Sequence, residues 1–249
     1  MKILYAKDAD TLSRYAADRF VEQIKSNPKS ILGLATGSTP KKMYEYLGED
    51  THVGKVSFSE ATSFNLDEYV GLAADHPASY HYFMEEYFFS KVDFKEGANS
   101  LPNGVAENLE KEALDYDQRI QDVGELDILI LGIGSNAHIG FNEPDDVFEP
   151  LTHVVALDHS TRQDNARFFN SIDEVPTHAI SLGMRAIMRA KKVLLLAFGE
   201  NKAEAIRDLV KGKVDPKVPA SILQLHANAT ILIDEGAASL LDESDYTSI

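Results

Sequence analysis

The sequence predicts an α/β protein built on a mainly parallel sheet with helices on both faces. Three observations predict this fold class. Short apolar runs alternate along the chain with amphipathic segments of helical period. The runs are apolar at consecutive positions, as in strands that are buried on both faces. No repeat, low-complexity linker or break in composition divides the 249 residues, so we expect a single domain.

Eight apolar runs are the expected strands, because each has the length and composition typical of a buried strand. They cover residues 2–6, 30–35, 62–66, 126–134, 153–158, 178–183, 192–198 and 229–235. Between them, apolar side chains recur at helical spacing, for example at Leu12, Ala16, Phe20 and Ile24. The expected helices cover residues 10–25, 41–47, 78–89, 107–123, 200–212 and 220–227.

Charge and composition exclude several function classes. The formal net charge is −16, and no Lys/Arg cluster is suited to displacing counterions from a duplex, so we expect no nucleic-acid partner. The absence of cysteine excludes disulfides, Cys-ligated zinc and a thiol nucleophile. No stretch is apolar enough to span a bilayer and the first residues lack a signal-peptide layout, so we expect a cytoplasmic protein without a membrane partner. Because the overall field repels anions, a phosphorylated ligand would need a local cradle of N–H groups and cations.

Three polar loops are the candidate ligand-binding segments. In parallel sheets, ligands bind at the carboxyl ends of the strands, where the connecting loops gather. The candidate loops read ATGSTP (35–40), NLDEYVGL (65–72) and GSNAHIGFNEP (134–144), and each follows an expected strand. We therefore expect the functional side chains to lie mainly in these loops.

The first loop has the features of an anion-binding site. Gly37 permits a tight backbone path, and Pro40 suits the first turn of the helix that follows. Thr36, Ser38 and Thr39 place hydroxyls beside the free N–H groups of that helix start, a combination that binds phosphate. The alternative is an ordinary strand-to-helix turn with Thr39 as its N-cap. The Gly-Lys-Ser/Thr ending of a Walker loop is absent.

Two adjacent acids, Asp67 and Glu68, lie in the second loop. Adjacent side chains point in different directions, so we do not expect them to act as a paired dyad. One carboxyl at the mouth of the sheet could have its pKa raised by desolvation and shuttle a proton, while the other makes a structural contact. The alternative is an acidic turn without a chemical role.

The third loop begins with a Gly-x-Gly turn. Residues 132–137 match G-x-G-x-x-A, a dinucleotide fingerprint that requires a helix to begin in the turn. Gly140, Asn142 and Pro144 would interrupt such a helix, and no apolar helical pattern follows. We therefore interpret the turn as a platform for polar side chains.

His138 is the side chain of this loop that can take up and return a proton near neutral pH. Asn136 and Glu143 flank it and could fix its tautomer or its charge. One alternative is a metal site formed by His138, Glu143 and Asp145, although this spacing fits no standard site. The other is a structural histidine, which is less suited to a polar, glycine-rich loop.

Several sequence blocks, taken in order, resemble the glucosamine-6-phosphate deaminase family, also called the glucosamine-6-phosphate isomerase family. They read LGLATGSTP, FNLDEYVGL with the nearby HPASY, LGIGSNAHIGFNEP, DNARFF and VPASILQLH. The resemblance covers nearly the whole chain. It implies a Rossmann-like fold and the conversion of glucosamine 6-phosphate and water to fructose 6-phosphate and ammonia, without a metal or an organic cofactor.

The resemblance also implies a role for each site residue. Asp67 is the base that moves a proton between C2 and C1, and His138 opens the sugar ring with Asn136 and Glu143 as its partners. The segment from about 158 to 176 resembles the mobile lid of the family. The implied phosphate cradle consists of Thr36, Gly37, Ser38, Thr39, Arg167 and Lys202.

Several positions depart from the family pattern. Asn136 stands where other members carry Asp, so it can orient His138 but cannot share a proton with it. Ala137 replaces a common Gly, which costs about 1 kcal/mol or more if the position needs a positive φ. His153 and Val155 stand where hexameric members carry an Arg-x-Lys pair for the phosphate of an activator, N-acetylglucosamine 6-phosphate. We therefore expect a monomer or small homo-oligomer that has no need of a hexamer.

Three other functions remain open from the sequence. A galactosamine-6-phosphate deaminase/isomerase would differ in epimer preference, which the sequence does not decide. A 6-phosphogluconolactonase-like hydrolase would share the phosphate loop and the Gly-x-Gly…His block, but is not expected to carry FNLDEYVGL or FNEP. A sugar-phosphate sensor could dispense with Asp67 and His138, and it usually needs an output domain.

Overall fold

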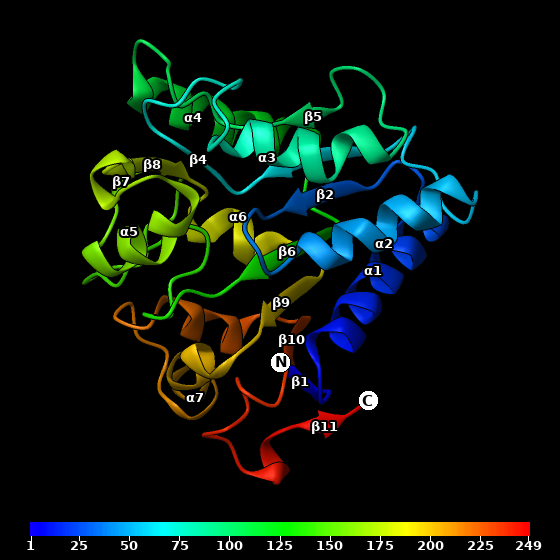
Figure 1. Cartoon of the computed structure of the whole chain (residues 1–249), viewed down its shortest axis with the longest axis vertical. Coiled ribbons are helices and arrows are strands. Elements are labelled where there is room, and N and C mark those ends of the chain that lie inside the picture. Colours follow the sequence, from blue (N-terminus) through cyan, green and yellow to red (C-terminus); the bar gives the residue numbers. More distant parts are fainter.

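The central element of the computed structural model, which describes all 249 residues, is an eight-stranded parallel sheet (Figure 1). Its strands are β1 (Lys2–Tyr5), β2 (Ile31–Leu34), β3 (Thr62–Asn65), β5 (Asn99–Ser100), β6 (Ile128–Gly132), β9 (Val193–Ala197), β10 (Ala229–Ile233) and β11 (Thr247–Ser248). Their order across the sheet is β11-β1-β10-β9-β6-β2-β3-β5. Because β1 pairs with β11, both termini lie at the same edge of the sheet (Figure 1).

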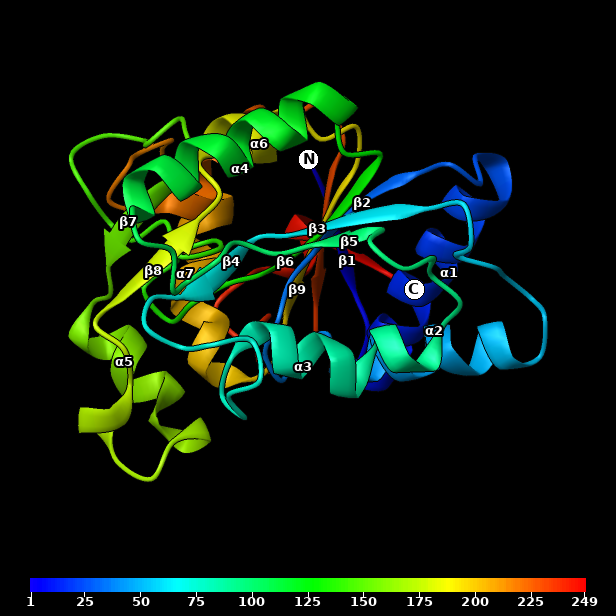
Figure 2. The same cartoon turned by 90° about the horizontal axis from the view of Figure 1, so that it is seen from above.

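Helices cover both faces of the sheet, which confirms the predicted Rossmann-like architecture (Figure 2). On one face, α1 (Ala9–Ser26) packs against α2 (Lys41–His52), which contacts α3 (Tyr80–Tyr87). On the other face lie α4 (Leu109–Val123) and α6 (Met184–Arg189). The stripe that predicted α1, comprising Leu12, Ala16, Phe20 and Ile24, is buried as its spacing requires.

The middle of the sheet is fully apolar. All five residues of β9 and four of the five residues of β6 are buried. Strands with helices on both faces have no polar side to show, so their apolar residues run consecutively. This explains why these runs were recognisable in the sequence without any alternation of polar and apolar residues.

Two of the predicted strands lie outside the main sheet. β7 (His153–Ala156) and β8 (His178–Ser181) form a separate antiparallel sheet with β4 (Asp67–Tyr69), in the order β4-β8-β7. Ser181 of the central strand β8 is aligned with Asp67 on one side and with His153 on the other. The apolar pattern predicted two of these strands, but it contained no information about their partner or direction.

Other short elements differ from the expectation. Residues Pro219–Leu225 form a 3₁₀ helix rather than an α-helix. Ala220 N donates outside the helix, to Ala137 O across 2.9 Å, and Ser221 N donates to Val218 O three residues back, which is the 3₁₀ pattern. α5 (His159–Asn165) and α6 were not predicted, and neither were the two-residue strands β5 and β11, because such short segments carry little periodicity. The helix expected over residues 200–212 begins as a 3₁₀ turn (Glu200–Lys202) and continues as α7 (Ala203–Lys211).

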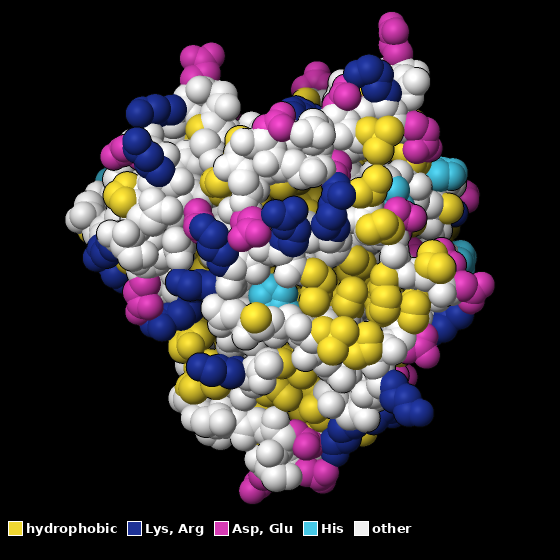
Figure 3. Space-filling view, turned by 180° about the vertical axis from the view of Figure 1, so that it is seen from behind, with side chains coloured by type: hydrophobic (Ala, Val, Ile, Leu, Met, Phe, Trp, Pro, Cys, Tyr) yellow, Lys and Arg dark blue, Asp and Glu magenta, His cyan; other side chains and the backbone are white.

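The outer surface is mixed in character. On the face in Figure 3, Lys and Arg side chains lie in small groups among Asp and Glu, and apolar side chains form a patch beside a histidine. None of the helices combines the length and the apolar character needed to cross a membrane.

Candidate active site

Four adjacent strands, β9, β6, β2 and β3, lead at their carboxyl ends into one cavity of about 310 Å³. The chain passes from β2 to β3 on one side and later returns to β6 on the other side of β2. The cavity therefore lies where the strand order reverses, the position at which such sheets bind ligands. All three loops singled out in the sequence contribute to its lining.

Eight of the ten predicted site residues line this cavity. The two that do not, Asn136 and Glu143, contact His138 from behind. The lining residues are Thr36, Gly37, Ser38, Thr39, Asp67, His138, Arg167 and Lys202.

Asp67 is the first residue of β4 and is only 6% exposed. Burial, followed by the charge of the neighbouring Glu68, raises the pKa of Asp67 to about 8. No hydrogen bond to the Asp67 carboxyl offsets this effect. A carboxyl whose pKa lies near neutrality is suited to taking a proton from a ligand and returning it.

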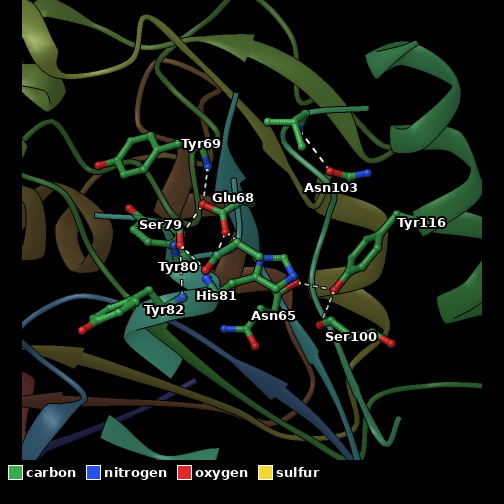
Figure 4. Close-up of polar contacts among 12 residues, drawn as sticks. Asn65, Glu68, Tyr69, Ser79, Tyr80, His81, Tyr82, Ser100, Asn103 and Tyr116 are labelled. Carbon is green, nitrogen blue, oxygen red and sulfur yellow. Dashed lines mark hydrogen bonds and ion pairs between the residues drawn. The ribbon is translucent and has the colours of Figure 1, made fainter. Parts of the chain in front are cut away.

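Glu68 has different surroundings, as expected for the next position along a strand. It is absent from the lining of the cavity. Its carboxyl instead accepts hydrogen bonds from the backbone N–H groups of Tyr80 and His81 at the start of α3 (Figure 4). Of the two adjacent acids, one therefore faces the ligand site and the other makes a structural contact.

His138 is held by Asn136. The Oδ1 atom of Asn136 lies 2.7 Å from His138 Nδ1, so Nδ1 carries the proton and Nε2 is left free to accept. Asn136 Nδ2 donates to Glu143 Oε2 across 2.8 Å, and Glu143 Oε2 lies 3.4 Å from His138 Nδ1. Burial alone would raise the pKa of Glu143, but hydrogen bonds and the charge of His138 lower it below its ordinary value. The carboxylate can therefore stabilise a protonated imidazole.

The backbone of the third loop explains part of its sequence. A Cβ atom at Gly134 would collide with the imidazole ring of His138, so the second glycine of the Gly-x-Gly turn makes room for this side chain. Ala137 adopts φ +66°, the only positive φ among the non-glycine residues. The strain expected at this position from the sequence is therefore present in the structure.

The first loop forms an anion cradle at the start of α2. The N-cap of α2 is Pro40, and no side chain caps the helix, so the alternative interpretation of Thr39 as the N-cap was wrong. The first N–H groups of the helix and the hydroxyls of the loop therefore remain available to a ligand. Gly37 has φ +105°, a conformation that side chains rarely adopt.

Two cations from distant segments reach the cradle. Arg167 donates to Ser38 Oγ across 3.1 Å, and Lys202 lies directly before α7. Burial lowers the pKa of Lys202, Arg167 lowers it further, and Asp164 opposes the shift. An incoming phosphate dianion would favour the charged form of this lysine, because an opposite charge nearby stabilises it.

The segment that connects β7 to β8 lies over the cavity and carries Arg167. α5 belongs to this segment, and Thr161 within it places Oγ1 3.3 Å from His138 Nδ1. Tyr80 of α3 also lines the cavity. Neither residue was a candidate from the sequence, although Tyr80 ends the block HPASY and Thr161 lies in the expected lid.

Two other interpretations of the third loop do not fit the structure. No helix begins after Gly132, so the turn lacks the element that a dinucleotide fingerprint requires. His138 and Glu143 lie together, but Asp145 is exposed and outside the cavity lining. The chain contains no group of three or more His, Asp or Glu side chains arranged to hold a metal ion.

Comparison with known proteins agrees with the geometry. Residues 7–232 match the family model described as glucosamine-6-phosphate isomerases/6-phosphogluconolactonase. A glucosamine-6-phosphate deaminase of Thermoanaerobacter pseudethanolicus is 49% identical over 249 residues, which cover 100% of this chain and 98% of the relative. A glucosamine-6-phosphate deaminase of Clostridium botulinum (strain Alaska E43) is 50% identical over 246 residues, 99% of each chain.

Solved structures give the same result. A structure described as a monomeric glucosamine-6-phosphate deaminase matches with a TM-score of 0.94 and 46% identity, covering 96% of this chain and 100% of that one. A 6-phosphogluconolactonase from Trypanosoma cruzi matches with a TM-score of 0.76 and 22% identity, covering 96% of each chain, which shows a shared fold. The chain therefore belongs to the family of glucosamine-6-phosphate isomerases and 6-phosphogluconolactonases, as its sequence blocks suggested.

Proposed function

We propose that this chain converts glucosamine 6-phosphate and water to fructose 6-phosphate and ammonia. One observation carries the proposal: a single cavity holds an unpaired buried carboxyl, an imidazole with a fixed tautomer and an anion cradle. The substrate assignment is further supported by full-length relatives at 49–50% identity that are named glucosamine-6-phosphate deaminase.

Ring opening is the role we assign to His138. A cyclic aldose must lose the proton of its anomeric hydroxyl while its ring oxygen gains one. The free Nε2 of His138 can accept the first proton and return it to the ring oxygen. Glu143, 3.4 Å from Nδ1, stabilises the imidazolium that exists between these two transfers.

Proton transfer between carbons is the role we assign to Asp67. The C2 proton of the open-chain aldehyde is only weakly acidic, so its removal needs a positioned and desolvated base. Asp67 takes this proton while O1 gains one from the ammonium group on C2, which gives an enolamine. Asp67 then returns its proton to C1, which leaves an iminium group at C2. Water then adds to C2 and ammonia leaves, giving fructose 6-phosphate. The net reaction is a hydrolytic deamination in which Asp67 and His138 are regenerated.

The phosphate does not react, and its binding energy orients the sugar. In this proposal it lies at the start of α2, with Arg167 and Lys202 as its cations. Arg167 belongs to the segment 158–176, which we propose is a lid that closes when the guanidinium engages the phosphate. In the arrangement seen here, Thr161 already lies 3.3 Å from His138 Nδ1, so we take it as the closed position, which would exclude water from the proton transfers.

We also propose an oligomeric state, a partner and a compartment for the reaction. A monomer or small homo-oligomer suffices, because one chain supplies every residue assigned to the site. The described monomeric deaminase of closely similar structure supports this view. The partner is a free sugar phosphate, and the reaction uses no nucleic acid, metal or organic cofactor. We place the reaction in the cytoplasm, where sugar phosphates are metabolised.

Ammonia release from purified protein tests the proposal. Glucosamine 6-phosphate, galactosamine 6-phosphate and 6-phosphogluconolactone are compared, with ammonia measured for the first two and acid formation for the third. We expect ammonia from the gluco epimer at a rate well above that from the galacto epimer. Faster release from the galacto epimer would change the epimer assignment. Lactone hydrolysis without ammonia release, or tight binding without any turnover, would reject the deaminase assignment.

A further inference from the structure

Glu68 is a buried carboxyl to which the assigned chemistry gives no role. Its side chain is 1% exposed, yet it accepts hydrogen bonds from four N–H groups (Figure 4). Tyr69 N and Tyr80 N lie 2.8 and 2.9 Å from its Oε1. His81 N and His81 Nδ1 lie 3.0 and 2.9 Å from its Oε2. Three of these donors are backbone amides, so the ionised carboxylate is the form that satisfies its surroundings.

These contacts connect two walls of the cavity. Tyr69 belongs to β4, the strand that carries Asp67, whereas Tyr80 and His81 are the first two residues of α3. Tyr80 lines the cavity, and its ring lies 4.8 Å from that of Tyr69, centroid to centroid. Without Glu68, the first N–H groups of α3 would lose their partners and this wall would lose its attachment to β4.

The charge of Glu68 also lies beside Asp67, a carboxyl that has no cation next to it. Glu68 is the one charged group that adds to burial in raising the pKa of Asp67. The other side chains that interact electrostatically with Asp67 are phenols, and burial raises the pKa of each of them, so they stay neutral. These phenols are Tyr44 on α2, Tyr69 on β4, Tyr80 on α3 and Tyr116 on α4.

The cationic and titratable groups on the far side of the cavity do not offset the effect of Glu68 on the pKa of Asp67. His138, Arg167 and Lys202 line the same cavity, but none of them contributes to the shift at Asp67. On the other side, His81 is the titratable group that contacts Glu68. Glu68 therefore acts on Asp67 without an intervening cation.

We propose that Glu68 is a positioning residue for the proton transfer: its carboxylate fastens α3 to β4, and its negative charge beside Asp67 strengthens Asp67 as a base. The inference rests on the proposed function, because it takes Asp67 as the group that removes the C2 proton. A stronger base is useful there, since the C2 proton is weakly acidic and the efficiency of a base rises with its basicity.

The test measures the titration of Asp67 directly, in the absence of substrate. ¹³C NMR of aspartate-labelled protein follows the Asp67 carboxyl, whose signal is assigned by its loss in Asp67→Asn. In Glu68→Gln we expect the titration midpoint to fall by about one pH unit, because a like charge is removed. The low-pH limb of kcat/KM should move by the same amount, since titrations of the substrate itself are common to all variants.

Two matched variants separate the effect of the Glu68 charge on Asp67 from the effect of its hydrogen bonds to α3. Glu68→Asp keeps the charge but is too short to reach α3, so its Asp67 midpoint should stay near that of the wild type while its melting temperature falls. Glu86→Gln removes an exposed carboxylate of α3 and should change neither the midpoint nor the activity. A purely structural role for Glu68 would lower the melting temperature in both Glu68 variants and would leave the midpoint unchanged in Glu68→Gln.

The outcomes are distinguishable from failure of the proposed function. An unmoved Asp67 midpoint in folded Glu68→Gln, with ammonia release intact in the wild type, would overturn this inference alone. A protein that releases no ammonia would overturn the reaction and, with it, the base role on which the inference rests. If Glu68→Gln does not fold, His81→Lys keeps Glu68 and sets a permanent cation beside it. Its Asp67 midpoint should also fall, and an unchanged midpoint would overturn the inference.

Discussion

Asn136 Oδ1 lies 2.7 Å from His138 Nδ1, while the same amide donates through Nδ2 to Glu143. An amide oxygen can orient the imidazole but cannot take a proton from it. His138 must therefore exchange its mobile proton through Nε2, on the side of the cavity. Where a carboxylate replaces this amide, a second route for the proton becomes available.

Asn136→Ala should lower kcat for the closed-ring substrate by about 10–100-fold, because a hydrogen bond to a group that becomes charged is worth about 1.5–3 kcal/mol. KM should change little, since Asn136 does not line the cavity. Steady-state kinetics check the result, with Asn136→Asp as the matched variant that retains an acceptor for His138. A kcat within twofold of the wild type in Asn136→Ala would contradict the assigned role.

Asp67→Asn should abolish deamination and stabilise the fold. The amide keeps the shape of the side chain but cannot carry the C2 proton, so binding of a product analogue should remain. In the wild type, the pKa of Asp67 is about 8 in the folded state, against about 3.9 for an unfolded chain. Between these values the folded protein binds the proton more strongly, so this group's contribution to stability declines as pH rises from about 4 to 8.

The Asp67→Asn variant does not lose stability in this way as the pH rises, because its amide does not titrate. Its unfolding free energy should exceed that of the wild type by about 1–3 kcal/mol at pH 8, and the difference should shrink towards pH 5. Urea denaturation at both pH values measures it. A difference that is independent of pH would show that Asp67 does not titrate in this range.

The pH dependence of kcat and kcat/KM should differ. The low-pH limb of kcat/KM reports the free enzyme, in which Asp67 has a pKa of about 8. The bound amino sugar brings an ammonium group to C2, next to this carboxyl, and an opposite charge lowers the pKa of an acid. We therefore expect the limb of kcat to lie about one pH unit or more below that of kcat/KM. Coincident limbs would mean that the amino group does not approach Asp67 in the complex.

Ala137→Gly should be neutral or stabilising, by up to about 1 kcal/mol, although glycine normally destabilises a buried position. The reason is the φ of +66° at Ala137, which a side chain makes unfavourable. The control is Ala17→Gly in α1, also buried, where the same change should cost about 1 kcal/mol. Thermal denaturation of both variants gives the comparison, and equal destabilisation would exclude strain at Ala137.

Kinetics in glucosamine 6-phosphate should be hyperbolic and unaffected by N-acetylglucosamine 6-phosphate. His153 Nδ1 is hydrogen-bonded to Leu151 O across 2.9 Å, and the side chain of Val155 has no polar group. These positions of β7 therefore do not form a second phosphate site. Allosteric coupling requires such a distinct site. A sigmoidal curve that becomes hyperbolic on addition of the N-acetyl sugar phosphate would refute this prediction. A hexamer in light scattering with hyperbolic kinetics would refute only the expected assembly.

The elements that the sequence predicted well are those whose local pattern matches their environment. β6 and β9 are buried on both faces and are apolar throughout, and the loop before α2 carries its own turn and hydroxyl chemistry. The pairing of Asp67 with Ser181 could not be predicted, because it joins strands more than a hundred residues apart. Thr161 was missed for the same reason, since its proximity to His138 depends on how the connection after β7 folds back.

The small sheet β4-β8-β7 holds two separate parts of the site, the base and the segment over the cavity. Asp67 sits on its outer strand β4, while residues 157–177, which contribute Arg167 and Thr161, form the connection between the neighbouring strands β7 and β8. A connection between adjacent antiparallel strands can change in length and composition without altering their register. Residues 157–177 can therefore vary in sequence while β4 stays in place, provided that Arg167 is kept and that Leu157 and Phe169 still pack against Tyr69 of β4.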